Sequence, residues 1–446
     1  MVSAAQDTGR HLGYGPAMLT RLKIHHFRDV VPGTELRFGP GFNVLLGVNG
    51  TGKTTLLNLI SAVLRGDFSS LRGEAFAVEY ELGVGLTTFS ATFTATLRHE
   101  PPRTTHAPRN GPAELGESIT GADRITARIH HRDPTLGEQS WLIEGGSLGL
   151  RFVRDDGKTT ISQPISLTEP GLHWKLPMAL YKSQESRVYQ NFGFSECYRF
   201  DESLGVMAAM VGEGGDGVPG ASIVVPLSEL QRGTNFFGLG TFLDGEIEAG
   251  IQADLRRNPD ADRFILMGAS LPFLATAVAA LGFVSAECWT SVSERRVRGE
   301  ETELEFNRFT YVFRRKDRSF VNHEHLSYGQ KRMVSFFYYL SVNFGPIVAD
   351  EIVNGLHHRW IETCVEAMRG RQAFLTSQNP VLLDCLGFES AKQVAETFIL
   401  CRTVEEGDAT RMSWRNMPEE DAADFFEAYN VGIQYASEIL RTRGWW

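Results

Sequence analysis

The sequence predicts an α/β fold in which a mixed sheet flanked by helices carries an antiparallel β-subdomain and a helical insertion. A short apolar strand near residues 42–46 runs into a glycine-rich loop, and residues 54–64 then carry apolar side chains at helical spacing. Residues 330–376 alternate helix, strand, helix and strand, which is typical of a parallel sheet covered by helices. Residues 76–97 alternate apolar and polar side chains, with many Thr, Val and Phe, as antiparallel strands do.

The predicted α/β domain is split along the chain, with an insertion between its two lobes. In chain order we expect a loose leader (1–18), an N-terminal lobe with the start of the β-subdomain (19–100), an inserted β-rich and helical region (101–320), a C-terminal lobe (321–400) and a helical tail (401–446). The insertion should contain a surface loop at 101–121, strands near 125–129, 141–143 and 150–153, and a buried helix at 264–284. No heptad pattern is long enough for a long coiled coil.

Composition indicates a soluble globular protein. Hydrophobic residues make up 42% and charged residues 22% of the 446 residues. The formal net charge of −10 gives no overall attraction to a polyanion, so nucleic-acid binding would need a local basic patch. The five cysteines never form a CxxC pair, which favours reduced core thiols and a cytoplasmic location. The apolar stretch at 264–284 is interrupted by glycine, serine and proline, so no membrane span is expected.

The glycine-rich loop at residues 47–54 fits the pattern GxxxxGK[ST] between a strand and a helix. Glycines let consecutive backbone N–H groups converge on a phosphate, and the helix N-terminus adds a favourable dipole. Lys53 would reach the β and γ phosphates of ATP, and Thr54 would ligate Mg²⁺. The alternative is a chance match in a structural loop. The predicted ATP-binding residues of this stretch are Asn49, Gly50, Thr51, Gly52, Lys53, Thr54 and Thr55.

Two carboxylates, Asp350 and Glu351, end the apolar strand at 347–349. In an enzyme with such a phosphate loop, the first acid helps to hold Mg²⁺ and the second can activate water, because the strand end faces the γ-phosphate. The alternative is a strand followed by an acidic turn. Together with the phosphate loop, the pair predicts Asp350 as a metal ligand and Glu351 as the catalytic base.

The stretch from Ser327 to Gln330 opens the helix predicted after it. Ser327 is a credible N-cap, so one interpretation is a capped helix start. The other is a second phosphate site, because a serine hydroxyl, the bare backbone of Gly329 and a helix N-terminus all suit an anion. One chain already has a phosphate loop for its own ATP, so the second site would serve another nucleotide.

Residues 327–332 resemble the LSxGQ signature of ABC ATPases, and the order of the motifs is that of the same family. Residues 22–55 resemble the heads of SMC, RecF and OLD-type proteins (OLD-like, AAA_21 ATPases), and residues 350–357 resemble the DEPENGLHP stretch of OLD-like ATPases. The resemblance covers about 19–66 and 322–385, under a third of the chain.

The resemblance implies an ABC-type head that pairs with a second copy. In such a pair Ser327, Gly329 and Gln330 would bind the ATP of the partner subunit, and Asn354 and His357 would belong to the D-loop. Arg28, in the matching N-terminal stretch, would join the ATP site.

Two further site residues are expected from where they lie relative to the predicted strands and loops. Gln378 occupies the switch loop, where many relatives place a histidine, and a glutamine can donate a hydrogen bond but cannot hold a proton. It is predicted to be catalytic, either with slow or partner-dependent hydrolysis or simply as the residue that positions water. Gln184 follows an apolar strand and would ligate Mg²⁺ as a Q-loop, although a surface turn is an equal interpretation.

Two surface features leave alternatives open. Basic residues lie near aromatic residues and suit nucleic acid, but acidic residues among them favour a solvated sheet face; the basic residues are Arg295, Arg296, Arg298, Arg314, Arg315, Lys316 and Arg318. Trp445 and Trp446 are apolar for a terminal segment, which indicates docking on their own core or on a partner.

Two functions follow from the resemblance. The first is a sensor or regulator of an anti-phage defence system, with a separate effector protein, because no nuclease signature follows the ATPase motifs. The second is a RecF-like DNA-repair ATPase that binds DNA across the head pair. The long insertion and the N-terminal resemblance argue against a transporter subunit.

Overall fold

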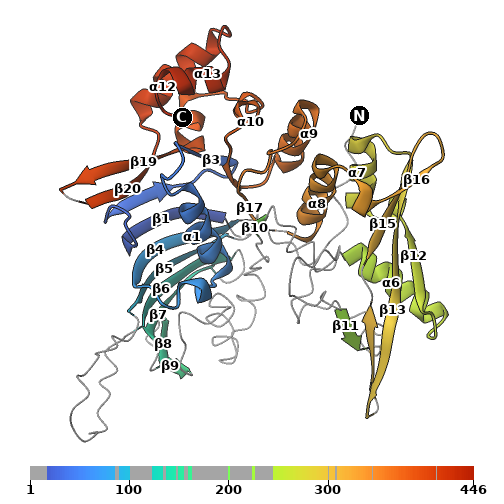
Figure 1. Cartoon of the computed structure of the whole chain (residues 1–446). Coiled ribbons are helices and arrows are strands. Elements are labelled where there is room, and N and C mark those ends of the chain that lie inside the picture. The colour runs from blue at the N-terminus through green and yellow to red at the C-terminus, as the bar shows by residue number, and fades with distance from the viewer. Residues whose placement is uncertain are drawn as a thin grey trace, which may run out of the picture. The chain divides into compact units, whose positions relative to one another are not determined.

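The computed structural model describes 13 stretches of the chain: 18–85, 90–100, 123–133, 137–146, 149–154, 159–162, 199–200, 223–226, 245–299, 301–306, 309–343, 345–407 and 409–446. The chain forms two compact units (Figure 1). The larger unit comprises 8–198, 345–349 and 368–446, and the smaller unit comprises 1–7, 199–344 and 350–367. The predicted leader and the predicted loop at 101–121 lie outside the described residues.

A mainly parallel sheet forms the centre of the larger unit. Four of its strands are parallel and β20 runs antiparallel to β19. In spatial order the strands are β17 (Ile347–Ala349), β18 (Ala373–Thr376), β3 (Phe42–Leu46), β19 (Phe398–Glu406) and β20 (Ala409–Asn416). Val44, Leu45 and Leu46 of β3 are fully buried, as expected for a central strand covered on both faces. Helix α1 (Lys53–Arg65) packs against β17 and β18, and α11 (Ala391–Thr397) against β3 and β19. This is the predicted α/β arrangement.

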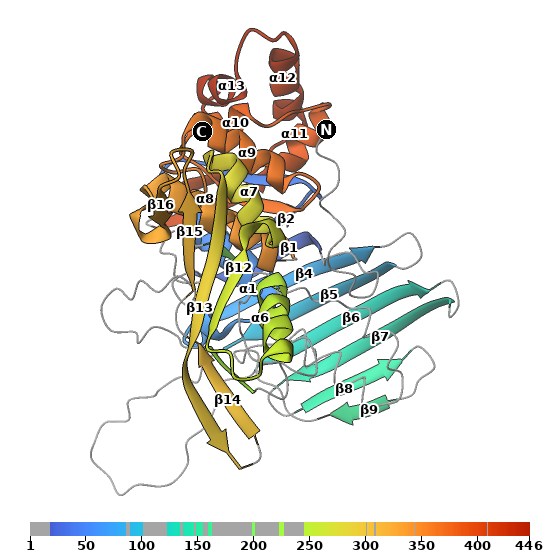
Figure 2. The ribbon, with the colours of Figure 1, turned by 90° about the vertical axis from the view of Figure 1, so that its right-hand side faces the viewer.

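An antiparallel sheet of eight strands forms the second layer of the larger unit (Figure 2). Its order is β2 (Thr34–Arg37), β1 (Met18–Phe27), β4 (Phe76–Gly85), β5 (Ser90–His99), β6 (Arg124–Asp133), β7 (Gly137–Gly146), β8 (Gly149–Arg154) and β9 (Thr159–Ser162). Alternate side chains such as Leu22, Val78 and Ile129 are buried in one core cluster with Leu56 and Ile60 of α1. The predicted antiparallel strands are confirmed.

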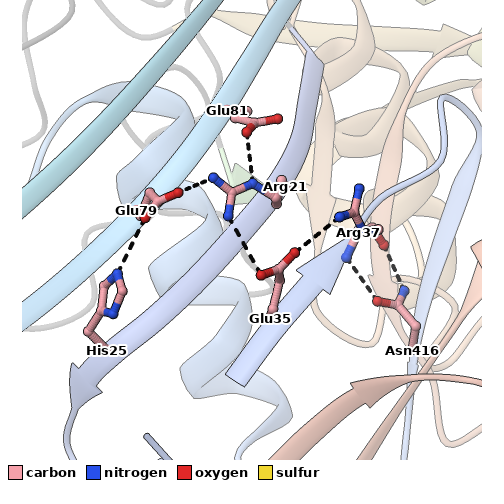
Figure 3. A network of polar contacts seen from close by, with 7 residues as sticks. All are labelled: Arg21, His25, Glu35, Arg37, Glu79, Glu81 and Asn416. Atoms are coloured by element: carbon pink, nitrogen blue, oxygen red, sulfur yellow. Dashed lines mark hydrogen bonds and ion pairs between the residues drawn. The ribbon is translucent and has the colours of Figure 1, made fainter. Parts of the chain in front are cut away.

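The outer face of this sheet carries a network of charged side chains around Arg21 (Figure 3). Arg21 donates to Glu79 and Glu81 of β4 and lies 3.7 Å from Glu35 of β2. The hydrogen bond from Arg21 lowers the pKa of Glu79 below its ordinary value of 4.5, against burial, which raises it. The side chain of Asn416 exchanges two hydrogen bonds with the backbone of Arg37, which ties β20 to β2.

The C-terminal part of the chain differs from the predicted helical tail. Residues 398–416 form the β19–β20 hairpin, and only then do α12 (Glu419–Asn430) and α13 (Ala436–Thr442) follow. The reason is tertiary: residues 398–401 are buried beside β3 in the parallel sheet, while the rest of β19 is exposed and polar and has no clear periodic signal. Between β18 and α11 lies the short helix α10 (Pro380–Asp384).

The smaller unit packs helices on an antiparallel sheet. The strands are β11 (Ile223–Pro226), β14 (Glu301–Phe306), β13 (Ser285–Arg298), β15 (Thr310–Arg314) and β16 (Phe320–Asn322), with β12 (Arg263–Met267) paired to β13. The helices are α6 (Gly245–Arg257), α7 (Pro272–Leu281), α8 (Tyr328–Val342) and α9 (His358–Met368), the last of which ends in the larger unit. Phe273 of α7 packs edge-on against Tyr311 of β15 and Tyr338 of α8. The short strand β10 (Arg199–Phe200) contributes Phe200, which contacts Phe336.

The predicted buried helix at 264–284 is wrong in its first half. That stretch forms strand β12, then the 3₁₀ turn η2 (Gly268–Ser270), and only from Pro272 the helix α7. Pro272 is at the start of α7, where proline is well tolerated and where it prevents the helix from extending backwards. Within the described residues, no helix is long and apolar enough to cross a membrane.

Candidate nucleotide site

The glycine loop connects β3 to α1 in the larger unit. Gly47, Gly50 and Gly52 have φ angles of 151°, 85° and 82°, a region that side chains other than glycine rarely adopt. A Cβ atom at Gly47 would lie 2.1 Å from the carbonyl oxygen of Cys401, so this position has no room for a side chain. At Gly50 a Cβ atom would meet nothing within 4 Å, so the loop is open on that side. The loop therefore has the curvature and the open face that a bound phosphate needs.

Lys53 folds back over this loop. Its ammonium group donates to the carbonyl oxygens of Gly47 at 2.7 Å and Val48 at 2.9 Å. Gly52 caps α1 without a side-chain hydrogen bond, and the first turn of the helix carries no acidic residue. The N-terminal N–H groups of α1 and the ammonium group thus present positive charge at one place, as a phosphate site requires.

Trp414 and Met412 of β20 contact the same loop through a hydrogen bond and close packing. The buried indole N–H of Trp414 donates to the carbonyl oxygen of Thr51 at 3.0 Å. A Cβ atom at Gly52 would lie 2.2 Å from the sulfur of Met412, so the hairpin packs tightly on the loop. Sequence reasoning missed both side chains, because nothing near residue 414 indicates which loop the strand will meet.

The described residues fit ATP and Mg²⁺. The glycine cradle and Lys53 suit a polyphosphate, and Thr54 is exposed at the N-terminus of α1. No cluster of three or more His, Cys, Asp or Glu side chains within the described stretches could hold a metal ion. Mg²⁺ in nucleotide sites takes most of its ligands from phosphates and water and needs few from protein, so a single hydroxyl donor such as that of Thr54 suits it.

The signature loop lies in the smaller unit, at the start of α8. The hydroxyl of Ser327 accepts from the N–H of Gln330, and the side chain of Gln330 accepts from the N–H of Ser327, so the two residues form a capping box. A Cβ atom at Gly329 would lie 2.9 Å from the carbonyl oxygen of Gly355 and 3.0 Å from the ring of Trp360. The capped helix start of the sequence analysis is therefore present, and glycine at 329 has a packing reason of its own.

Arg332 joins the signature helix to the acidic turn after β17. Its guanidinium is buried and donates to the carbonyl oxygen of Ile352 at 2.8 Å and to that of Glu351 at 2.5 Å. Glu351 adopts a φ of 46°, which is uncommon for a residue with a side chain, and its carboxylate accepts from the side-chain amide of Asn354. Arg332 and Asn354 therefore hold the predicted base from two sides. Arg332 lies in the signature stretch but was not among the predicted site residues.

The D-loop residues pack on the start of α8. Gly355 has a φ of 71°, and a Cβ atom there would lie 2.8 Å from the ring of Tyr328. The exposed side chain of His357 lies beside the ring of Trp360, which donates to the carbonyl oxygen of Ala280 at the end of α7. Within the smaller unit the signature loop, the acidic turn and the D-loop thus form one packed cluster.

The switch loop follows β18 in the larger unit. Thr376 and Ser377 are buried, whereas the next residue, Gln378, is exposed. The Ser377 hydroxyl accepts from the N–H of Asn379, and the Asn379 side chain accepts from the N–H of Val381 and so caps α10. Because β18 and β3 are parallel neighbours, the switch loop and the glycine loop leave the sheet at the same edge.

The remaining predicted residues are placed as follows. Arg28 donates two hydrogen bonds to Glu74, at 2.6 and 2.7 Å, and these bonds raise the pKa of Arg28, so the structure gives it a carboxylate partner. Gln184 lies outside the described residues.

In the basic cluster, Arg295 pairs with Asp262 and Arg296 with Glu305, as expected for a solvated sheet face. The side chains of Cys288, Cys364 and Cys401 are buried, that of Cys385 is half-buried, and Cys197 lies outside the described residues.

A known protein family matches the part of the chain that holds the glycine loop. The family, described as an AAA domain (AAA_23), matches residues 21–103, which include most of β1 and all of β3, the loop and α1. The match supports an ATPase of the P-loop class. No curated protein matches the chain.

Several solved structures match the chain over most of its length at low identity. The Smc head bound to the C-winged helix domain of ScpA has a TM-score of 0.35 at 10% identity, over 90% of this chain and 98% of that one. The SMC head domain from Thermotoga maritima has a TM-score of 0.31 at 12% identity, over 88% and 97%. The recombination mediator protein RecF-ATPrS has a TM-score of 0.29 at 11% identity, over 92% and 100%. At these scores nothing further follows from the superpositions.

Proposed function

We propose that this protein is an ABC-type ATPase that binds Mg-ATP on the loop at 47–54 and closes as a head-to-head pair with a second copy. The observation that supports this most strongly is the glycine loop, with its open face at Gly50 and Lys53 folded over it, on a parallel sheet. Bound ATP and Mg²⁺ would supply the phosphoryl group and the charge that polarises it. Lys53 would hold the β and γ phosphates, while Thr54 and Asp350, together with Gln184 of the Q-loop, would hold the metal.

In this proposal the acidic turn carries out the proton chemistry. Glu351 would accept a proton from the attacking water, and its backbone is held by Arg332 while its carboxylate is held by Asn354. Gln378 would donate a hydrogen bond at the γ-phosphate end, since it is exposed beside the edge where β3 ends. Arg28 would complete the ATP site by exchanging its partner Glu74 for the nucleotide.

Exposed apolar side chains in the glycine loop and in the signature loop are compatible with the proposed pairing. The side chains of Val48 in the glycine loop and Tyr328 in the signature loop are 70% and 58% exposed. In a pair that closes over both loops, these two side chains would be covered. Ser327, Gly329 and Gln330 of one copy would then meet the ATP of the other, with the Asn354 and His357 region crossing between copies.

A mixing experiment tests the pairing. Lys53→Ala should abolish ATP binding, since it removes the ammonium group from the phosphate loop. Ser327→Arg should keep ATP binding in its own loop but block ATP-dependent pairing and hydrolysis. Mixing the two variants creates pairs in which one composite site carries both changes and the other carries neither, so part of the activity should return. ATP-driven pairing of the Ser327→Arg variant at the wild-type level, measured by light scattering, would refute the proposed pairing.

We further propose that the ATPase is the sensor or regulator of an anti-phage defence assembly with a separate effector protein. The support is the resemblance of residues 350–357 to OLD-like ATPases. Isolation of the protein from its native cells tests this: co-purification of a nuclease or toxin supports defence. Co-purification of recombination proteins would instead support the alternative, a RecF-like repair ATPase that binds DNA. The ion pairs of Arg295 and Arg296 with nearby acids do not favour DNA on that face.

A further inference from the structure

The last helix of the chain, α13, is hydrogen-bonded to α10, the helix that follows the switch loop. The backbone N–H of Ser437, at the start of α13, donates to Asp384 at the end of α10 at 2.9 Å. The hydroxyl of the same serine donates to the other carboxylate oxygen of Asp384 at 3.0 Å. Ser437 is buried and Asp384 is half-buried, so the two bonds are partly shielded from water. All these residues belong to the larger unit.

The residues after α13 return to the switch loop itself. Trp445 is buried, and Arg402 of β19 donates to the carbonyl oxygen of Gly444 at 3.2 Å. The next side chain, the half-buried Trp446, donates its indole N–H to the carbonyl oxygen of Ser377 at 3.4 Å. The two tryptophans therefore dock on their own unit, which was one of the two alternatives in the sequence analysis.

This contact falls on the residue that precedes Gln378. The carbonyl of Ser377 belongs to the peptide unit that joins Ser377 to Gln378, so a hydrogen bond to it restrains the backbone on which the Gln378 side chain is mounted. On the other side of the loop, α10 is held through Asp384. Both ends of the exposed loop segment are thus restrained by residues 437–446.

We propose that Trp446 is a positioning residue for ATP hydrolysis, acting through the Ser377 carbonyl on the side chain of Gln378. The proposal depends on the ATPase function proposed above. It predicts that the C-terminal residues control the rate of the chemical step and leave the binding of ATP unchanged, because the glycine loop is held separately by Trp414. A displacement of about 1 Å at a catalytic group is enough to slow a reaction strongly.

Trp446→Phe tests this with little disturbance, because it keeps an aromatic side chain at this position and removes the N–H donor. We expect kcat to fall about three- to tenfold, the range for one lost hydrogen bond, with KM for ATP unchanged. Trp446→Ala should lower kcat at least as much. Arg443→Ala is the matched control, since it removes an exposed ion pair with Asp424 in the same segment without contacting the switch loop, and it should hydrolyse ATP at the wild-type rate.

A double-mutant cycle with Gln378→Ala separates positioning from a general loss of structure. If Trp446 acts through Gln378, Trp446→Phe should change kcat little once Gln378 is already alanine. Multiplicative effects of the two substitutions, a wild-type kcat in Trp446→Phe, or a wild-type kcat in Gln378→Ala would each overturn the inference. Failure of the ATPase proposal looks different: the wild-type protein would hydrolyse no ATP, or Lys53→Ala would hydrolyse it as fast as wild type.

Discussion

Replacing Arg332 by methionine should lower the melting temperature of the smaller unit, in which the signature loop, the acidic turn and the D-loop pack together. Arg332 is 4% exposed, and its guanidinium is bonded to two backbone carbonyl oxygens and to the hydroxyl of Tyr328 at 3.0 Å. Methionine has a similar length and stays apolar, so it fills most of the space but donates no hydrogen bond. The substitution therefore removes the polar contacts with little change in packing.

The expected loss in free energy of unfolding is the sum of the losses at the two carbonyl oxygens that Arg332 contacts. The oxygen of Ile352, a residue that is 1% exposed, loses its bond to Arg332, and a buried acceptor left without a donor costs about 1–3 kcal/mol. The oxygen of Glu351 keeps the N–H of Asn354 at 3.0 Å, so only the charged donor is lost there, at about 1 kcal/mol. The free energy of unfolding should fall by about 3 kcal/mol in total, which lowers the melting temperature of a unit of this size by about 6–12 °C.

Calorimetry and steady-state ATPase assays check the two consequences. Besides the lower Tm of the smaller unit, kcat should fall, because the backbone of Glu351 loses its hydrogen bond from Arg332, whereas ATP binding to the glycine loop should persist. Arg359→Met is the control: Arg359 is exposed on α9, and its substitution should change stability by less than about 0.5 kcal/mol. If Arg332→Met melted within about 2 °C of wild type, the buried hydrogen bonds of Arg332 could not have the energy assigned to them here.

Three further outcomes are expected. Glu351→Gln keeps the shape and removes the base, so it should retain ATP, stop turnover and accumulate pairs with ATP; turnover at the wild-type rate would move the catalytic role elsewhere. Trp414→Phe removes the donor to Thr51 and should weaken ATP binding with a stability loss of about 1–2 kcal/mol, measured by nucleotide titration and thermal melting; unchanged ATP affinity would contradict a bracing role. Glu79→Gln should cost about 0.5–1 kcal/mol at pH 7. Since the bond from Arg21 lowers the pKa of Glu79, that stabilisation is fully present above pH 4.5 and is lost as pH falls through the lowered pKa, so pH-dependent melts of variant and wild type should converge below that lowered pKa.

Some of the candidate site could be read from local sequence because its signals are local. The glycine loop needs positive φ angles at Gly47, Gly50 and Gly52, and only glycine adopts them freely, so the pattern is visible in a window of eight residues. The capping box of Ser327 and Gln330 spans four residues and is equally visible. The strand and helix on either side of the loop follow from hydrophobic periodicity, which the structure confirms for β3 and α1.

The contacts that brace these motifs could not be predicted in the same way. The indole of Trp414 meets Thr51 across 363 positions of the chain, and that of Trp446 meets Ser377 across 69. Arg332 reaches the carbonyl oxygen of Ile352 across 20 positions, through a turn whose path the sequence pattern does not specify. The β19–β20 hairpin forms where a helical tail was expected, because β19 has β3 as a parallel neighbour.

Local sequence thus determined which residues can present backbone N–H groups, an ammonium group and carboxylates to a nucleotide, since short-range sterics and capping depend on near neighbours alone. Tertiary structure decided which distant side chains hold those groups in place. Burial and ladder hydrogen bonds depend on the whole sheet. Residues 398–416 form strands because β19 pairs with β3 on one side and with β20 on the other.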